Sequence, residues 1–330
     1  MFPQQRMRRL RGRLIQPFLK EYHLQKTDLV MPLFIDETAD RLTPIPAMPC
    51  QFRYPPGDIG SAVLRLQEKG IGAVLLFGIP AHKDPGASGS YNPEGVIQEA
   101  VRRVKSVAPG ILVITDVCAC EYTDHGHCGI VGEGLYGMDL QNDPSLELIA
   151  RIAVSHARAG ADFVAPSCML DGMVSVIRQA LDDEGFQETG IMSYSTKFAS
   201  ALYSPFREAA DSGFRYGDRS TYQIHPGNFR EAVRESEIDA LEGADILMVK
   251  PGGFYLDLVA SIRELGLPVA VYQVSGEYAM IKAAAMNGWI DERNVVMESL
   301  ICAKRAGADL IITYYAADAA GWLDEEQRLL

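Results

Sequence analysis

Three cysteines are clustered within eleven residues of a chain that holds only six. They are Cys118, Cys120 and Cys128, and the first directly follows an apolar run with the composition of a β-strand. Three thiolates at the end of a buried strand can hold a zinc ion and leave one coordination position free, as in a catalytic metal site. For Cys118 and Cys120 alone, two reduced buried thiols are an equally good interpretation. The third cysteine and the nearby His125 and His127 favour the metal site.

Two lysines, Lys197 and Lys250, stand at the ends of later apolar runs. Each lysine alone is better interpreted as a strand-end residue that reaches solvent or pairs with a carboxylate. If both face one cavity, desolvation and mutual repulsion lower the amine pKa and make at least one amine nucleophilic near neutral pH. A Schiff base with a ketone requires such an amine. Taken together with the cysteine cluster, the lysine pair favours covalent catalysis.

The composition is that of an ordinary soluble globular enzyme, with 330 residues, 48% hydrophobic and 22% charged. A net charge of −12 disfavours nucleic-acid binding, because the field of the protein repels phosphates. The basic segment 6–13 is therefore interpreted as a solvated or subunit-clasping terminus. The sequence has neither a run long enough to cross a membrane nor a signal peptide, so we expect a cytoplasmic protein with Cys50, Cys168 and Cys302 as free thiols.

Eight short apolar runs alternate with amphipathic helical segments, which is the pattern of βαβ units. The runs are 28–35, 72–78, 111–118, 161–167, 190–197, 244–250, 268–275 and 308–315, and the predicted helices are 58–69, 93–107, 146–159, 172–183, 229–241, 256–265, 278–287 and 292–306. Eight strands predict a closed α/β barrel, the (β/α)8 or TIM barrel, at residues 28–330 behind an extended N-terminal arm at residues 1–27.

A weak internal repeat supports the barrel. Gly-Ala-Asp occurs at the start of three runs, ending at Asp162, Asp245 and Asp309, and the glycine suits the left-handed residue that ends a helix. No G-x-G-x-x-G follows a strand, which argues against a Rossmann fold. Active sites of barrels lie at the carboxyl ends of the strands. The reactive residues at these ends are Cys118, Ser167, Lys197, Lys250, Ser275 and Tyr314.

Several long motifs extend over almost the whole chain. They include Cys118-x-Cys120-Glu-Tyr-Thr-x-His-Gly-His-Cys128-Gly, Met192-Ser-Tyr-Ser-Thr-Lys197, Ser204-Pro-Phe-Arg207, Leu247-Met-Val-Lys250-Pro and Tyr272-Gln-Val-Ser-Gly-Glu. In these motifs the chain resembles the porphobilinogen synthase family, also called 5-aminolevulinate dehydratases. The resemblance implies condensation of two 5-aminolevulinate molecules into porphobilinogen with loss of two waters, an early step toward haem and other tetrapyrroles.

The resemblance also implies a role for each strand-end residue. Lys250 would form a Schiff base with the substrate that supplies the propionate side of the product, and Lys197 with the substrate that supplies the acetate side. Ser275 and Tyr314 match the residues that bind the carboxylate of the first substrate. Asp116 lies where it could steer a substrate amine or a bound water, as does Asp124, and the sequence does not decide between these roles.

The second carboxylate would be bound by residues of the connection between the fifth and sixth strands. Arg207 and Arg219 match its binders, and guanidinium geometry suits a carboxylate. Together with Gln223 they fall in a long loop, near residues 201–223, that we expect to act as a lid excluding water from the imine intermediates.

Zinc is the metal that the resemblance implies for the three cysteines, because soft thiolates favour zinc, whereas relatives with aspartates there use magnesium. We expect His125 and His127 to shape the loop through hydrogen bonds. Glu235 matches an acidic position that holds an allosteric magnesium ion in some relatives, although a solvated helix glutamate is an equally good interpretation. Relatives typically form homo-octamers in which the N-terminal arm wraps a neighbouring barrel.

Two other functions account for only part of the pattern. A lysine-dependent barrel aldolase needs one Schiff-base lysine and usually a phosphate site, and it accounts for neither the second lysine nor the three cysteines. A non-catalytic, zinc-holding assembly protein on a decayed barrel predicts the loss of one lysine, whereas both are present.

Overall fold

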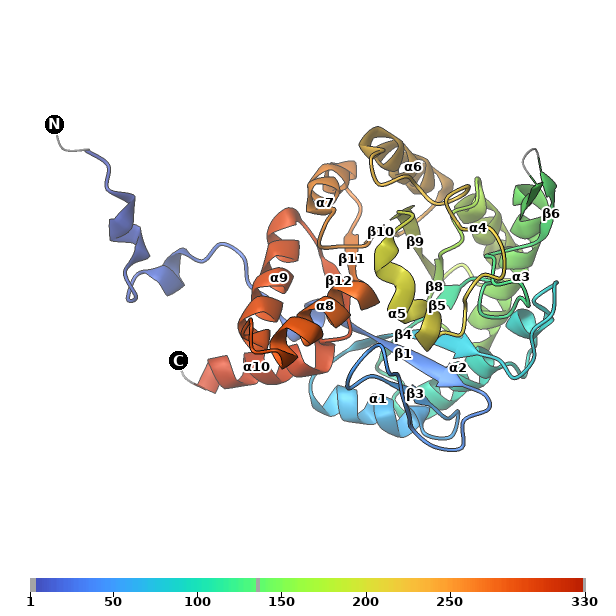
Figure 1. Ribbon diagram of the computed structural model, residues 1–330, viewed down its shortest axis with the longest axis horizontal. Helices are drawn as coiled ribbons and strands as arrows, with labels where there is room; N and C mark the ends of the chain where they lie inside the picture. Colours follow the sequence, from blue (N-terminus) through green and yellow to red (C-terminus); the bar gives the residue numbers. More distant parts are fainter. Residues whose placement is uncertain (1–3, 135–136, 329–330) are drawn as a thin grey trace.

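Eight parallel strands form a closed barrel in the computed structural model, which describes residues 4–134 and 137–328 (Figure 1). In order, the barrel strands are β1 (Leu29–Asp36), β4 (Ala73–Ile79), β5 (Leu112–Val117), β8 (Phe163–Pro166), β9 (Gly190–Lys197), β10 (Ile246–Lys250), β11 (Val269–Gln273) and β12 (Leu310–Thr313). Each strand pairs with the next, and β12 pairs with β1 to close the barrel. The predicted TIM barrel is therefore confirmed.

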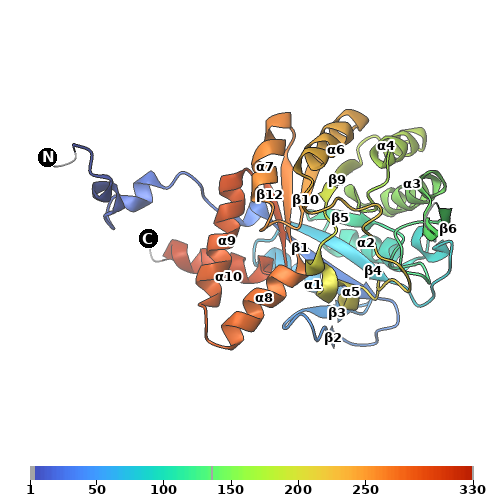
Figure 2. The ribbon, with the colours of Figure 1, turned by 45° about the horizontal axis from the view of Figure 1, so that its top comes forward.

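Helices surround the barrel, as Figure 2 also shows from a second direction. They are α1 (Ile59–Glu68), α2 (Val96–Val107), α3 (Asn142–Ala159), α4 (Met173–Asp183), α6 (Phe229–Glu242), α7 (Leu256–Ile262), α8 (Ser275–Met286), α9 (Glu292–Ala306) and α10 (Ala316–Arg328). Helix α3 begins four residues before its predicted start, and α2 begins three residues after its own. There are two further differences. Helix α10 was not predicted, and α8 begins three residues early, so that Ser275 opens a helix rather than ending a strand. The cause is Glu277, whose carboxylate accepts a hydrogen bond from the Val274 N–H (2.8 Å).

Several short elements lie outside the eight barrel strands. They are β2 (Thr43–Pro44), β3 (Phe52–Tyr54), the antiparallel pair β6 (Val131–Gly134) and β7 (Gly137–Leu140), and, after β9, the turn η5 (Ala201–Tyr203) and helix α5 (Ser204–Ala209). Strand β3 pairs with the end of β1, and β2 pairs with β3. The segment from 210 to 228 then returns to α6 without regular structure.

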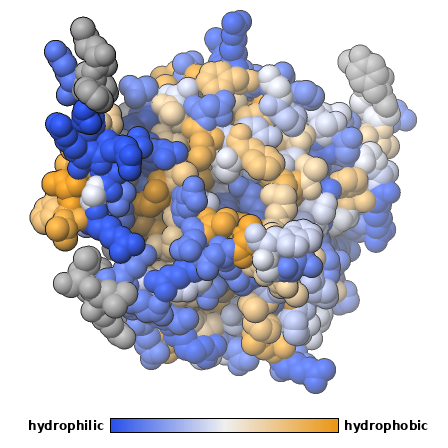
Figure 3. All heavy atoms as spheres, turned by 60° about the vertical axis from the view of Figure 1, so that its left-hand side comes forward, coloured by the Kyte–Doolittle hydropathy of each residue, from blue (hydrophilic) through white to orange (hydrophobic). Residues whose placement is uncertain are grey.

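The N-terminal arm extends away from the barrel in Figure 1. It contains the short turns η1 (Met7–Arg11), η2 (Gln16–Leu19) and η3 (Lys26–Asp28). Leu14 and Phe18 on it are 90% and 84% exposed. Figure 3 turns this side of the molecule forward and shows apolar side chains among hydrophilic ones. Of the predicted arm (1–27) and barrel domain (28–330), residues 1–3, 135–136 and 329–330 lie outside the described residues.

The aspartates of the internal repeat join neighbouring strands at their amino ends. Each carboxylate accepts a hydrogen bond from the backbone N–H of the preceding strand: Val113 for Asp162 (2.7 Å), Ile191 for Asp245 (2.7 Å) and Val269 for Asp309 (2.9 Å). The preceding glycine ends the helix in the left-handed region in each case, as at Gly243 with φ of 105°. In the repeat, the glycine therefore ends the helix, and the aspartate holds the start of the following strand against the start of the preceding strand.

Replacing Asp245 by alanine should remove the acceptor for the Ile191 N–H. We expect the free energy of unfolding to fall by about 1 kcal/mol, the typical net value of such a bond. Urea unfolding followed by circular dichroism measures it. The exposed Asp40 provides a matched control, and Asp40→Ala should change the value by less than about 0.5 kcal/mol. Equal losses in the two variants would contradict the assigned role of Asp245.

Candidate active site

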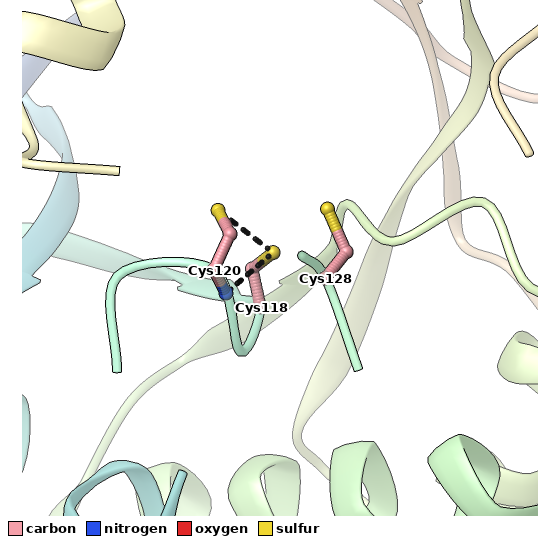
Figure 4. A group of neighbouring side chains, drawn as sticks. All are labelled: Cys118, Cys120 and Cys128. Atoms are coloured by element: carbon pink, nitrogen blue, oxygen red, sulfur yellow. Dashed lines mark hydrogen bonds between the residues drawn. The ribbon is translucent and has the colours of Figure 1, made fainter. Parts of the chain in front are cut away.

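The three cysteines meet at the carboxyl end of β5. Cys118 directly follows the strand, and the thiol sulfur of Cys120 lies 3.3 Å from that of Cys118. Cys128 returns beside them on the far side of a tight loop, and all three sulfur atoms lie within 4.8 Å of one another (Figure 4). The three side chains are buried. The sequence prediction that these residues come together is thus supported by their placement.

The donor set fits a metal ion. Hydrogen bonds from Cys118 and Cys120 hold the pKa of the Cys128 thiol well below its usual value, and the thiolate is the form that binds metals. By contrast, burial raises the pKa of Cys118 well above its usual value. In the metal-free cluster Cys118 therefore keeps its proton, whereas Cys128 releases its own. Asp116, Cys118 and Glu121 form a second, overlapping group of possible ligands. The described residues therefore include a cluster that can hold a metal ion.

Glu121 was not singled out from the sequence, although it stands within the cysteine motif. Its carboxylate is buried and accepts a hydrogen bond from the Cys120 thiol (3.2 Å). Burial, and next the charge of Asp116, raise the pKa of Glu121 to about 7. The contact depends on the turn after Cys120, which no spacing rule predicts.

Lys197 and Lys250 are direct neighbours in the register of β9 and β10. Both are buried, at 4% and 5% exposure. The Nζ of Lys197 donates a hydrogen bond to the carbonyl oxygen of Ser167 (2.6 Å). The Nζ of Lys250 lies instead among aromatic rings, 4.3 Å from the ring centre of Tyr272 and 5.0 Å from that of Phe206. The two amines thus share one buried region and have different surroundings.

The surroundings shift the two amines in opposite directions. Burial, and then the positive charge of Lys197, lower the pKa of Lys250 to about 7. Burial also acts to lower the pKa of Lys197, but the thiolate of Cys128 and the other cysteines outweigh it and raise that pKa. A large share of Lys250 is therefore neutral and nucleophilic near pH 7, while Lys197 stays protonated.

Asp116 joins the lysine pair to the cysteine loop. It is the second-last residue of β5, and its Oδ2 accepts a hydrogen bond from the Ser167 hydroxyl (3.1 Å). Its Oδ1 is buried and has no partner among the described residues. Burial raises the pKa of this carboxyl group, although Lys197 and Lys250 act to lower it. Asp116 is thus placed to accept a proton or to bind a cationic group beside Lys197.

Ser275 and Tyr314 lie on the side of Lys250. The Ser275 hydroxyl oxygen accepts a hydrogen bond from the Phe206 N–H (2.9 Å), and the Tyr314 hydroxyl pairs with that of Tyr272 (3.0 Å). Phe206 and Tyr272 are two of the residues whose rings surround the Lys250 amine. Each hydroxyl group is therefore hydrogen-bonded to a residue whose ring encloses this amine.

Arg207, Arg219 and Gln223 follow β9 as predicted. Arg219 is buried and donates hydrogen bonds from Nη2 to the carbonyl oxygens of Gly126 (2.9 Å) and Ser212 (2.8 Å). Burial, and then the charge of Arg219, lower the pKa of Arg207. The Nε atoms of both arginines and the Nε2 of Gln223 are buried donors without a partner in the part of the chain that the structure describes. Three unsatisfied donors of this kind suit an anionic ligand.

Glu235 lies on α6 and lines a cavity that Gln223 also lines. Asp171 and Glu231 line the same cavity, which has a volume of ≈ 390 Å³. Burial, and next the charge of Asp171, raise the pKa of Glu235 to about 7. The glutamate is therefore half-buried among other acids rather than freely solvated.

The barrel, the buried lysine pair and the thiol cluster define a (β/α)8-barrel enzyme with a site that can hold a metal ion. The sequence profile of the Delta-aminolevulinic acid dehydratase family matches residues 4–322. The chain therefore belongs to this family and is a lyase, which confirms the resemblance seen in its motifs. No helix among the described residues is long and apolar enough to cross a membrane.

Curated relatives share about half of their residues with the chain over nearly their full length. The chain is 52% identical to the Delta-aminolevulinic acid dehydratase of Archaeoglobus fulgidus over 320 residues, covering 97% of this chain and 98% of the relative. It is 50% identical to that of Escherichia coli over 318 residues, covering 96% and 97%. A crystal structure of the Toxoplasma gondii enzyme in complex with the reaction product porphobilinogen has a TM-score of 0.95 at 43% identity, covering 99% of this chain and 93% of the other.

The pKa of Lys250 predicts a pH-dependent reactivity. Only a neutral amine reacts with acetic anhydride, so the acetylation rate of Lys250 should rise with pH and reach half of its maximum near pH 7. In Lys197→Met, loss of the neighbouring charge should move this midpoint to higher pH. Quantitative mass spectrometry of the Lys250 peptide measures the rate, with the exposed Lys69 as the control. A midpoint near pH 10 for Lys250 in the protein without substitutions would contradict the lowered pKa of this amine.

Proposed function

We propose that the chain is a porphobilinogen synthase that condenses two 5-aminolevulinate molecules, with release of two waters, through Schiff bases on two lysines. The observation that carries the proposal is the direct pairing of Lys197 with Lys250 beside the three-cysteine cluster. Membership of the Delta-aminolevulinic acid dehydratase family and the product-bound T. gondii relative support the same reaction. The step belongs to tetrapyrrole, and hence haem, biosynthesis.

In the proposed reaction Lys250 is the first nucleophile. Its neutral amine attacks the ketone of one substrate, and loss of water gives an imine in a region enclosed by aromatic rings. Ser275 and Tyr314 are the proposed hydroxyl donors to the carboxylate of this substrate. To serve, the Ser275 hydroxyl turns its proton from the Leu202 carbonyl oxygen (3.4 Å), a long and weak bond, toward the substrate.

The second substrate is proposed to form its imine with Lys197. This amine must first give up a proton, and the unpartnered Oδ1 of Asp116 is the nearby acceptor that the surroundings offer. Arg207, Arg219 and Gln223 supply their unsatisfied N–H groups to the carboxylate of this substrate. We further propose that residues 201–223 act as the lid, since binding of the carboxylate draws these donors together and excludes water.

Zinc is the proposed metal of the cluster formed by Cys118, Cys120 and Cys128, because three thiolates form a soft donor set. When bound, the metal supplies Lewis acidity beside the second substrate. For Glu235 we propose an allosteric magnesium ion, on the support of the cavity that it shares with Asp171 and Glu231.

A homo-octamer in the cytoplasm is proposed as the assembled form. The exposed Leu14 and Phe18 of the arm favour burial against another subunit, because large apolar side chains are rarely left this exposed in a cluster. A reducing compartment keeps the six cysteines, all of them free, available as thiols.

Borohydride trapping tests the lysines. After incubation with 5-aminolevulinate and reduction, mass spectrometry should find the substrate adduct on Lys250, with porphobilinogen formed in parallel unreduced samples. Lys250→Met should lose at least about 10³-fold in kcat, in line with removal of a covalent nucleophile. The exposed Lys69→Met variant serves as the control and should keep both adduct and activity. Absence of any adduct and of any pyrrole product would exclude the proposed function.

Metal content tests the cysteines. The purified protein should contain zinc bound by the cluster, and chelation should abolish activity that zinc with a reductant restores. Cys120→Ala should lose most of the bound zinc, because two thiolates remain of three. Cys302→Ala, which alters a cysteine outside the cluster, is the matched control. Full activity of Cys120→Ala in zinc-free buffer would rule out the zinc role.

A further inference from the structure

The cysteine loop, residues 118–128, is in direct contact with residues 210–223, the later part of the proposed lid (201–223), which is called the lid segment below. The backbone N–H of Arg215 donates a hydrogen bond to the His125 carbonyl oxygen (3.1 Å), and Arg219 donates to that of Gly126. A side chain at position 126 would overlap the carbonyl oxygen of Gly213, and the φ of Gly126 is 77°. The two backbones therefore touch at a place where only glycine fits.

His127 is at the centre of this contact. Its ring is buried, with Nε2 3.1 Å from the Tyr216 carbonyl oxygen and Nδ1 3.1 Å from the Tyr222 hydroxyl. One neutral tautomer satisfies both bonds, because Nε2–H donates to a carbonyl that can only accept, and Nδ1 accepts from the phenol. The ring centre also lies 5.2 Å from that of Tyr216. Both ring nitrogens are thus directed to the lid segment.

The same residue is fixed to the metal-binding cluster. His127 precedes Cys128 in the chain, and its carbonyl oxygen accepts a hydrogen bond from the Thr123 hydroxyl (2.9 Å). The next carbonyl oxygen, that of Cys128, accepts one from the Cys168 thiol (3.1 Å). Because both carbonyls are held, the backbone between the His127 ring and the Cys128 sulfur is ordered, and the two side chains leave one fixed segment. Among the described residues the ligand groups contain no histidine, so His127 remains available for the lid.

We propose that His127 is a positioning residue that couples metal binding at the three cysteines to closure of the lid segment, and thereby to the placement of Arg219. Metal binding restricts the cysteine loop to the geometry in which His127 bonds Tyr216 and Tyr222. Linkage requires the reverse effect as well, so that loss of the lid contacts weakens metal binding. The proposal rests on the proposed metal site and needs no substrate.

Cleavage by trypsin after Arg215 measures the coupling. Arg215 is exposed, and the bond after it leads into Tyr216, whose carbonyl oxygen His127 holds. The full-length protein is digested with zinc bound and after chelation, and the rate of cleavage at this bond is followed by mass spectrometry. In the unaltered chain zinc should slow this cleavage about tenfold, within the usual range of coupling between two sites.

Two variants locate the coupling. His127→Phe keeps a ring and removes both hydrogen bonds. Tyr222→Phe removes the lid hydroxyl that bonds His127 and that also interacts with the Cys128 thiol. Both should reduce the protection by zinc to below about threefold. Both should also raise the zinc dissociation constant by at least the factor by which the protection falls. Competition with a chromophoric chelator measures this constant. Tyr22→Phe, on the exposed N-terminal arm, is the control and should change neither value.

The outcomes separate this proposal from the proposed metal site. Failure of the purified protein to bind zinc would overturn the metal site itself. Zinc binding without protection at Arg215, or equal protection in the unaltered chain and in both variants, would overturn the coupling through His127 and leave the metal site intact. If His127→Phe does not fold, the protection at Arg215 in zinc-saturated Tyr222→Phe decides, because at saturation it does not depend on the direct effect of the Tyr222 hydroxyl on Cys128.

Discussion

The register of β9 and β10 places two lysine amines side by side where there is little water. Two ammonium groups in such a position lose hydration and repel each other, so the surroundings must supply negative charge or remove a proton. Negative charge stabilises Lys197 as an ammonium group, and Lys250 loses its proton more readily. Lys197 lies near the thiolate of Cys128 and donates to the Ser167 carbonyl oxygen, whereas Lys250 lies among aromatic rings and has a pKa of about 7. The difference between their environments assigns the two amines different charges.

Most of the barrel could be predicted because strands buried on both faces read as short, continuous apolar runs. The missed elements lacked that signal. The apolar residues of helix α10 do have helical spacing, but its buried positions are mostly small alanines and it contains Gly321, which weakens the signal. The apolar run of β11 passes into α8 without a break. There the boundary depends on the carboxylate of Glu277, which also accepts a hydrogen bond from the Gly253 N–H (2.7 Å). Glu277 follows Val274 at the spacing of a capping box, but Val274 lacks the hydroxyl that marks such a box in a sequence, and the contact with Gly253 leaves no local pattern.

The site divides in the same way. Residues at strand ends could be predicted, because the barrel brings the ends of its strands to one rim. Contacts made by loops could not. Glu121 reaches the Cys120 thiol through the turn after Cys120. His127 reaches the lid where Gly126 takes up a left-handed conformation that lets two backbones touch. From the sequence both histidines were expected to shape the loop, but neither the partner nor the direction of either ring could be inferred.

The two arginines proposed to bind one carboxylate are anchored to different parts of the molecule. Arg207 lies on α5, which is tied to the barrel at both ends, since Phe206 donates to Ser275 and the Ala209 carbonyl oxygen accepts from Arg53 (2.9 Å). Arg219 is tied instead to the cysteine loop through Gly126. In the proposed function a bound carboxylate therefore bridges a part fixed to the barrel and a part fixed to the metal-binding loop. Because each guanidinium also repels the other, the ligand's negative charge is what makes their approach favourable.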